Sequence, residues 1–240
     1  MNRAAIVLFA LLALAGVLLD RREGVRSASA GRTVRDTRVE QTGPPTEIVD
    51  ACGGYNPFFA MTSMVFEAEG QNADDRPAVI AFRDTSLDRG GDGRTLATMA
   101  QVGAVHGLAY DAVRGHLYVG AYHKRAVYFG PGGPGQVYRI DLADGAVTPF
   151  VTLSAGADQH DTLRRNLDAD GAEFVGKVGL GDLEIDDAAG QLFVANLLTH
   201  RIHRFSLPDG AELPAFRNGA DAEPWRTNAR LFGLGWRNGW

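Results

Sequence analysis

The chain has 240 residues, of which 45% are hydrophobic and 22% charged, a balance typical of soluble globular proteins rather than of disordered or multi-pass membrane proteins. Its formal net charge of −5 argues against nucleic-acid binding, because phosphate contacts need clustered Lys and Arg. The single cysteine, Cys52, excludes an intramolecular disulfide and a cysteine-based zinc site, and we interpret it as a small buried residue or a free thiol.

The first segment, residues 1–19, is predicted to direct export. A short basic start precedes Ala4–Leu19, a run of apolar residues without a charge. This length suits the apolar region of a signal peptide, whereas a membrane span needs about 20 residues. Two interpretations stay open, a cleaved export signal and an uncleaved signal anchor. Either one predicts a periplasmic, cell-surface or extracellular protein, with membrane anchorage in the second case.

Residues 20–52 are predicted to form a flexible linker. Arginines are frequent at its start and Ser, Thr, Gly and Pro follow, with no apolar period. Such a composition does not bury enough apolar surface to fold by itself. The folded part is therefore expected to cover residues 53–240.

The folded part contains a repeat. Gly107–Ala121 and Asp182–Asn196 share one pattern: an alternating strand, a turn, and a second strand of the form Leu-aromatic-Val-small. In each turn an Asp is placed to bond the backbone ahead of it, and a Gly can supply a positive φ. These turn residues are Asp111 with Gly115, and Asp186 with Gly190.

Two further apolar stretches follow each of these hairpins. They are predicted as strands over 135–142 and 148–153 in the first unit, and over 199–207 and 212–216 in the second. Four short strands joined by turns make one blade of a β-propeller. The fold class is therefore predicted to be all-β, an incomplete propeller of about three four-stranded blades behind an apolar N-terminal helix and a linker.

A weaker unit precedes these two, and part of another follows them. Residues 77–82 and 94–99 are predicted as the third and fourth strands of the weaker unit, with an earlier strand near 61–67. Residues 231–236 resemble the first strand of another blade, and Asn238-Gly239 is typical of a hairpin turn. Because closed propellers have four or more blades, we interpret the chain as a fragment of a longer protein, or as an arc closed by self-association.

Two insertions interrupt the repeat. Residues 122–134 lie within the first unit, and residues 154–178 lie between the two units. Since loops carried by a rigid scaffold often hold the binding residues, these insertions are predicted to form the recognition surface.

The second unit, with Ile185-Asp186, Gly190, Phe193-Val194-Ala195-Asn196 and His200-Arg201-Ile202, resembles the NHL repeat. The first unit, with Leu117-Tyr118-Val119 and Val137-Tyr138-Arg139-Ile140-Asp141, is similar to YVTN-type and gluconolactonase-like propeller blades. The segments Phe129–Gly135 and Val175–Asp182 also resemble propeller segments of large bacterial cell-surface proteins. The resemblance implies a propeller over roughly 105–216 and says little about activity.

A calcium site is one candidate in the second insertion. Asn166, Asp168 and Asp170 place oxygen donors at alternate positions before a glycine, as a calcium-binding loop does. Lys177 stands where that loop needs a bidentate Glu, so a polar surface loop is the alternative. The possible cofactor is accordingly a divalent cation such as Ca²⁺.

Two other candidates complete the set. Asp158, His160 and Asp161 combine carboxylates with an imidazole that can bind a metal or transfer protons. His106 and Asp182 stand at the start of inner strands, where a propeller faces its central channel. The resemblance to lactonases implies a metal near Asp182, and the alternative is that Asp182 bonds the backbone at a strand start.

The sequence therefore predicts an exported or membrane-anchored binding or scaffolding module without catalytic residues, whose partner is an unknown protein or small molecule. The alternative is a metal-dependent hydrolase similar to gluconolactonases.

Overall fold

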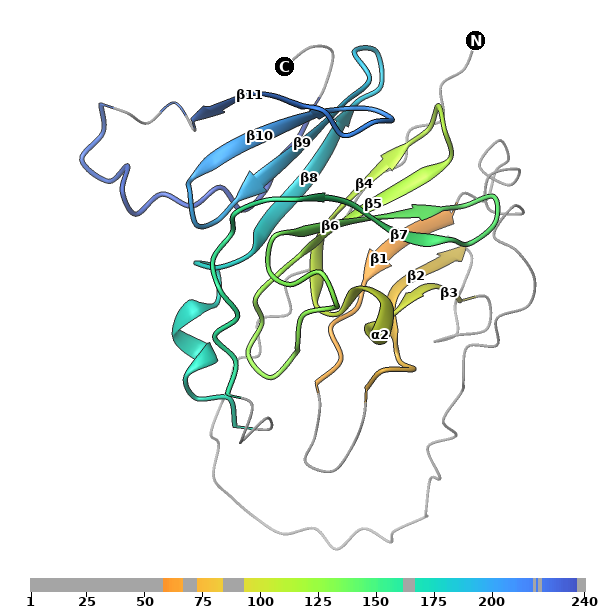
Figure 1. The fold of residues 1–240 in the computed structure, drawn as a ribbon, viewed down its shortest axis with the longest axis horizontal. Coiled ribbons are helices and arrows are strands. Elements are labelled where there is room, and N and C mark those ends of the chain that lie inside the picture. Colours follow the sequence, from red (N-terminus) through yellow and green to blue (C-terminus); the bar gives the residue numbers. More distant parts are fainter. Residues whose placement is uncertain are drawn as a thin grey trace, which may run out of the picture.

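The computed structural model describes residues 58–66, 73–83, 93–161, 167–217, 219 and 222–236. These residues form three antiparallel sheets with one short helix and one 3₁₀ turn (Figure 1). The all-β prediction is confirmed for them. The predicted N-terminal helix, the linker over 20–52, Cys52 and the turn at Asn238-Gly239 lie outside the described residues. Within the described part, no helix is both long and apolar enough to cross a membrane.

Each sheet is a meander in which every strand pairs with the next one along the chain. The first sheet contains β1 (Phe58–Thr62), β2 (Pro77–Arg83) and β3 (Arg94–Thr98). The second contains β4 (Val105–Asp111), β5 (His116–Ala121), β6 (Gln136–Asp141) and β7 (Val147–Thr152). The third contains β8 (Leu180–Asp186), β9 (Gln191–Asn196), β10 (Arg201–Ser206) and β11 (Glu212–Arg217). Helix α2 (Met99–Val102) joins β3 to β4, and η1 (Gly171–Phe174) precedes β8.

The two four-stranded units are confirmed, and the weaker unit needs a correction. Within the described residues, 77–83 form the middle strand of the first sheet and 94–98 form its edge, so both predicted strands are present. The first strand, β1, begins earlier than expected, at Phe58. After β3 the chain enters α2, and this sheet has three strands within the described residues.

The two predicted hairpin turns form as expected. The Asp111 carboxylate accepts hydrogen bonds from the amides of Val113 and Arg114, both at 3.0 Å. Asp186 accepts in the same way from Ala188 and Ala189. Gly115 and Gly190, at the ends of these turns, have φ of 70° and 62°, values that side-chain-bearing residues rarely adopt.

The core lies between the sheets in two layers, so the middle sheet is buried on both faces. Side chains alternate along a strand. As a result, Leu117 and Val119 of β5 join the core shared with the first sheet, while Tyr118 joins the core shared with the third. This explains why β5 is apolar almost throughout rather than at every second position.

The first strands of successive sheets lie side by side, as Figure 1 shows for β4 and β8. They approach so closely that a Cβ added to Gly107 in β4 would lie 2.4 Å from the carbonyl oxygen of Gly181 in β8. A Cβ at Gly181 would in turn lie 2.5 Å from the carbonyl oxygen of Leu231. Residues 231–236 therefore run beside β8 where a further first strand was predicted, and the Asp182 amide donates to the Phe232 carbonyl at 3.0 Å.

The two insertions meet at one end of the sheets. The β5–β6 and β7–β8 connections both start from strands that run toward this end, where β4 and β8 begin (Figure 1). Helix α2 lies at the same end, and the Ala104 amide after it donates to the Tyr128 carbonyl at 2.8 Å. We call this end the insertion end.

Candidate functional site

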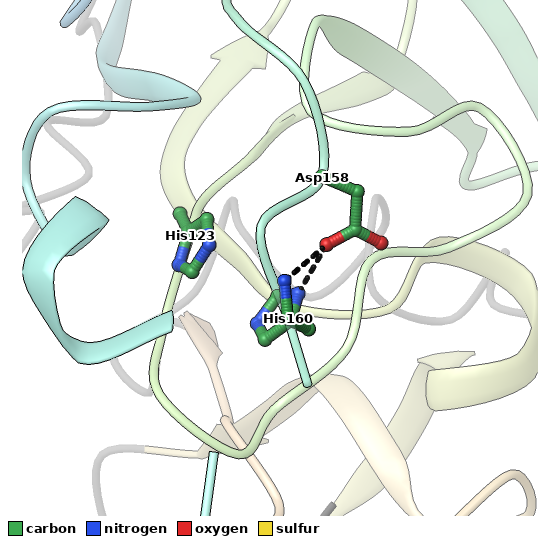
Figure 2. Close-up of side chains that lie close together, drawn as sticks. All are labelled: His123, Asp158 and His160. Atoms are coloured by element: carbon green, nitrogen blue, oxygen red, sulfur yellow. Dashed lines mark hydrogen bonds and ion pairs between the residues drawn. The ribbon is translucent and has the colours of Figure 1, made fainter. Parts of the chain in front are cut away.

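Three side chains that can bind a metal converge at the insertion end. His123 comes from the β5–β6 connection, and Asp158 and His160 come from the β7–β8 connection (Figure 2). Each offers one ligand atom, and these atoms all lie within 4.8 Å of one another. We call these residues the His123–Asp158–His160 cluster.

His160 is held by both ring nitrogens. Its Nδ1 lies 2.6 Å from Asp158 Oδ1, and its Nε2 lies 3.0 Å from the Lys124 carbonyl oxygen (Figure 2 shows the first of these). Burial alone would lower the pKa of His160, but the hydrogen bonds to Asp158 and Lys124 outweigh it and raise this pKa above its ordinary value. Burial would raise the pKa of the Asp158 carboxyl, but the hydrogen bonds that it accepts from the ring and the backbone amide of His160 outweigh burial and lower this pKa.

His123, unlike His160, has no hydrogen bond at its ring within the described part of the chain. Its side chain is fully buried, and neither ring nitrogen has a hydrogen-bond partner among the described residues. Its ring stacks on His160 with centroids 4.2 Å apart. Burial, reinforced by His160, lowers the pKa of His123 to about 4. One neutral and one readily protonated imidazole therefore share the cluster.

Aromatic rings surround the two histidines. Phe129 lies edge-on to both, at 5.4 Å from His123 and 5.3 Å from His160. Tyr128 lies 4.7 Å from His160, and Phe174 of η1 lies 6.3 Å from His123. The exposed side of the cluster is Asp158, whose side chain keeps 50% of its surface in contact with solvent. The cluster is thus enclosed by apolar groups on the histidine side and open at the carboxylate.

The structure describes two of the three predicted calcium ligands, Asp168 and Asp170. Asp168 is fully buried, and its carboxylate accepts the amides of Ala126 at 2.7 Å and Asp161 at 2.8 Å. Asp170 is exposed, and Asn166 lies outside the described residues. Asp168 Oδ2 also lies 3.8 Å from His160 Nε2, so this carboxylate stands behind the cluster. The calcium loop stays a prediction.

The predicted channel residues His106 and Asp182 lie on the adjacent first strands β4 and β8. The Asp182 carboxylate accepts the amides of Leu183 at 2.9 Å and Leu234 at 3.1 Å. The His106 ring packs against Phe232 and Tyr122, with centroids 4.7 and 5.3 Å away. Burial lowers the pKa of His106, and Asp182 opposes this only in part. Asp182 thus bonds the backbone at the start of β8, which is the alternative given for it from the sequence, and it also holds Leu234 beside β8. A ligand-binding role for His106 and Asp182 stays a prediction.

Asp158 and His160 were predicted from the sequence as candidate site residues, whereas His123 was not. His123 is separated from them along the chain, and no motif spacing links the three. One indication was available: His123 directly follows a strand, at the start of an insertion that the strand order places at the same end as 154–178.

No family model matches the chain. Colossin-D of Dictyostelium discoideum is 28% identical over 203 residues, which cover 77% of this chain and 21% of that protein. Colossin-B of the same organism is 27% identical over 176 residues, covering 70% of this chain and 4% of that protein. Colossin-C is 31% identical over 111 residues, 43% of this chain and 11% of that protein. The chain thus spans about a fifth or less of these relatives.

Among solved structures, an auxiliary nutrient binding protein from Bacteroides thetaiotaomicron matches 61% of this chain and 26% of its own, with 15% identity and a TM-score of 0.37. A GH74 xyloglucanase from Xanthomonas campestris matches 72% of this chain and 24% of its own, with 16% identity and a TM-score of 0.37. The strand order of this chain itself defines its three meander sheets.

Proposed function

We propose that the chain forms part of a β-propeller that binds a ligand outside the cytoplasm, and that its insertion end is the binding surface. The strand order supports the propeller, because both four-stranded sheets are meanders and their first strands, β4 and β8, pack against each other. NHL-like blades are the finer form of this proposal. Export, with or without membrane anchorage, is supported by the apolar run Ala4–Leu19.

One observation carries the binding role: the two insertions are joined to each other by several polar contacts, and the one from the Ala126 amide to Asp168 is buried. The Arg125 guanidinium donates twice to the Leu167 carbonyl, at 2.8 and 2.6 Å. The Ala126 amide donates to Asp168, and the Tyr128 hydroxyl donates to the Asp161 carbonyl at 3.2 Å. A surface that is ordered before binding loses less entropy when the ligand binds. These contacts are therefore expected for a recognition surface that is ordered before the ligand binds, rather than for two loops that only connect strands.

A thermal-shift screen of the 240-residue chain tests the binding role, with oligosaccharides and short peptides as probes. A ligand of the folded state raises Tm. We expect at least one probe to do so, and the shift to shrink in a Glu173→Ala/Lys177→Ala variant, which removes two exposed charges near η1. Val113→Ser, at an exposed turn on the opposite end of the sheets, is the matched control. A shift that disappears with Val113→Ser but survives the double substitution would place binding elsewhere.

The hydrolase similar to gluconolactonases has less support, because Asp182, its proposed metal ligand, already accepts two backbone amides. Acid release from glucono-1,5-lactone, followed with added Zn²⁺ or Ca²⁺, separates the two functions. Under the binding proposal, the chain leaves the spontaneous rate unchanged. Metal-dependent acceleration that is abolished by Asp182→Ala would favour the hydrolase instead.

A further inference from the structure

We propose that His123, Asp158 and His160 bind a transition-metal ion of the Zn²⁺ type at the junction of the two insertions. The first support is convergence: two imidazoles and one carboxylate, from two segments of the chain, bring their ligand atoms within 4.8 Å. This site does not depend on ligand binding at the insertion end, because an ion that only joins the insertions would occupy it equally well.

The second, independent support is the bare imidazole of His123. Its side chain is fully buried, yet both ring nitrogens lack a hydrogen-bond partner among the described residues. A buried polar atom left unpaired costs about 1–3 kcal/mol, and in native proteins such atoms are nearly always paired with protein, water or an ion. A metal beside His160 and Asp158 would bind the lone pair of one His123 nitrogen, which no hydrogen-bond donor among the described residues reaches.

The surroundings of His160 match those of a metal-binding histidine. Such residues usually donate one ring N–H to a carbonyl or carboxylate, which orients the ring and leaves the other nitrogen for the metal. His160 Nε2 faces the Lys124 carbonyl at 3.0 Å, with Asp168 Oδ2 at 3.8 Å. Its Nδ1 then faces Asp158 and is the ligand atom. When His160 is protonated, its Nδ1 proton passes to solvent as the metal binds, and the Nε2 proton stays in its hydrogen bond to the Lys124 carbonyl.

The donor set selects the class of metal. Two nitrogens and one oxygen suit Zn²⁺ and related ions, whereas Ca²⁺ takes six to eight oxygen ligands. Around a zinc ion with bonds of about 2.0–2.2 Å the ligand atoms lie roughly 3.4 Å apart, and the ion lies in the plane of each imidazole. The His123 ring therefore has to turn out of its stack with His160, and Asp158 Oδ1 has to move away from His160 Nδ1, which is now 2.6 Å from it. Asp158 can supply that movement because its side chain is half exposed. The exposed side also leaves a fourth position for water or for a ligand atom.

Isothermal titration of the EDTA-treated, dialysed 240-residue chain with Zn²⁺ alone tests the site. We expect saturable binding of one ion per chain, with Ca²⁺ binding far more weakly. Co²⁺ should occupy the same site and show visible absorption bands of nitrogen and oxygen coordination. Asp158→Asn, an isosteric change on the exposed side, should weaken Zn²⁺ binding by about 100-fold, the upper range seen even for outer-shell changes. His123→Phe should do the same and keep the buried ring.

Two controls match these variants. Asp170→Asn removes an exposed carboxylate of the same insertion, and His116→Phe removes a histidine at the opposite end of β5. Both should bind Zn²⁺ as the unmodified chain does. The proposal is overturned if the unmodified chain shows no saturable Zn²⁺ binding, if Ca²⁺ binds as tightly as Zn²⁺, or if binding survives both Asp158→Asn and His123→Phe. Circular dichroism of Asp158→Asn establishes that any loss of affinity occurs in a folded protein.

Discussion

Asp168 holds the backbone of Ala126, 42 residues earlier in the chain, through a hydrogen bond of 2.7 Å between its carboxylate and the Ala126 amide. Both residues have positive φ, 36° at Asp168 and 56° at Ala126. Non-glycine residues adopt this region only when their surroundings determine it. The bond therefore fixes both insertions where they meet, and it lies directly behind the His123–Asp158–His160 cluster.

Replacing Asp168 by Ala should lower the free energy of unfolding by about 3 kcal/mol, because the amides of Ala126 and Asp161 lose their acceptor. Urea unfolding measures this change. The exposed neighbour gives the control, since Asp170→Ala should change stability by less than about 0.5 kcal/mol. Equal effects of the two substitutions would mean that the buried carboxylate does not join the insertions.

Gly107→Ala should destabilise the protein by about 1–3 kcal/mol through overpacking. The new methyl group would lie 2.4 Å from the Gly181 carbonyl oxygen, and a backbone atom cannot move away as a flexible side chain does. Gly235→Ala is the matched control, since nothing lies within 4 Å of its added Cβ. Thermal unfolding of both variants checks the prediction, and a neutral Gly107→Ala would contradict the close approach of β4 and β8.

Asp182→Ala should release residues 231–236 from β8. The substitution removes the acceptor of the Leu234 amide, and one such bond contributes about 1 kcal/mol. We expect hydrogen exchange at the Leu234 amide to accelerate several-fold. The Leu142 amide, which donates to the Gly115 carbonyl in another sheet, is the internal control. An unchanged rate at Leu234 would show that the segment is held by Phe232 and its other contacts.

Acidification should destabilise the protein through His106. Burial lowers the pKa of His106 below 6.5 in the folded state, so the unfolded chain binds the proton more readily. The stabilisation is complete above pH 6.5 and declines as pH falls from there toward the lowered folded pKa. His106→Phe keeps the ring beside Phe232 without a titrating group. Urea unfolding at pH 7.5 and 5.5 should therefore show a smaller loss in His106→Phe than in the unmodified chain.

Much of the fold could be predicted because local chemistry determines it. The turns at Asp111 and Asp186 depend on an Asp bonding the backbone ahead and on a Gly with positive φ, and both form as predicted. The strand alternation then determines which connections share one end. The first sheet was harder to delimit, because its strands β1 and β3 span only five residues each, and β1 is placed by its pairing with β2 and its packing against β4 rather than by a pattern of its own.

The candidate site was only half predictable for a related reason. Asp158 and His160 lie two residues apart, so their chemistry is visible in one short segment. His123 joins them only because two long connections fold against each other, and that contact depends on buried bonds such as Asp168 to Ala126. Nothing in the periodicity of either segment encodes this contact.

The glycines of the first strands have a consequence for how such a protein can change its size. Gly107 lets the backbone of β8 approach, and Gly181 lets residues 231–236 approach in the same way. The first strand of each of these two four-stranded units therefore has a glycine that lets the following segment approach. In the second unit the same glycine, Gly181, also offers its carbonyl group to the glycine of the preceding unit. A tandem duplication of one unit would bring a complete contact of this kind with it, so sheets could be gained or lost without a new interface having to arise.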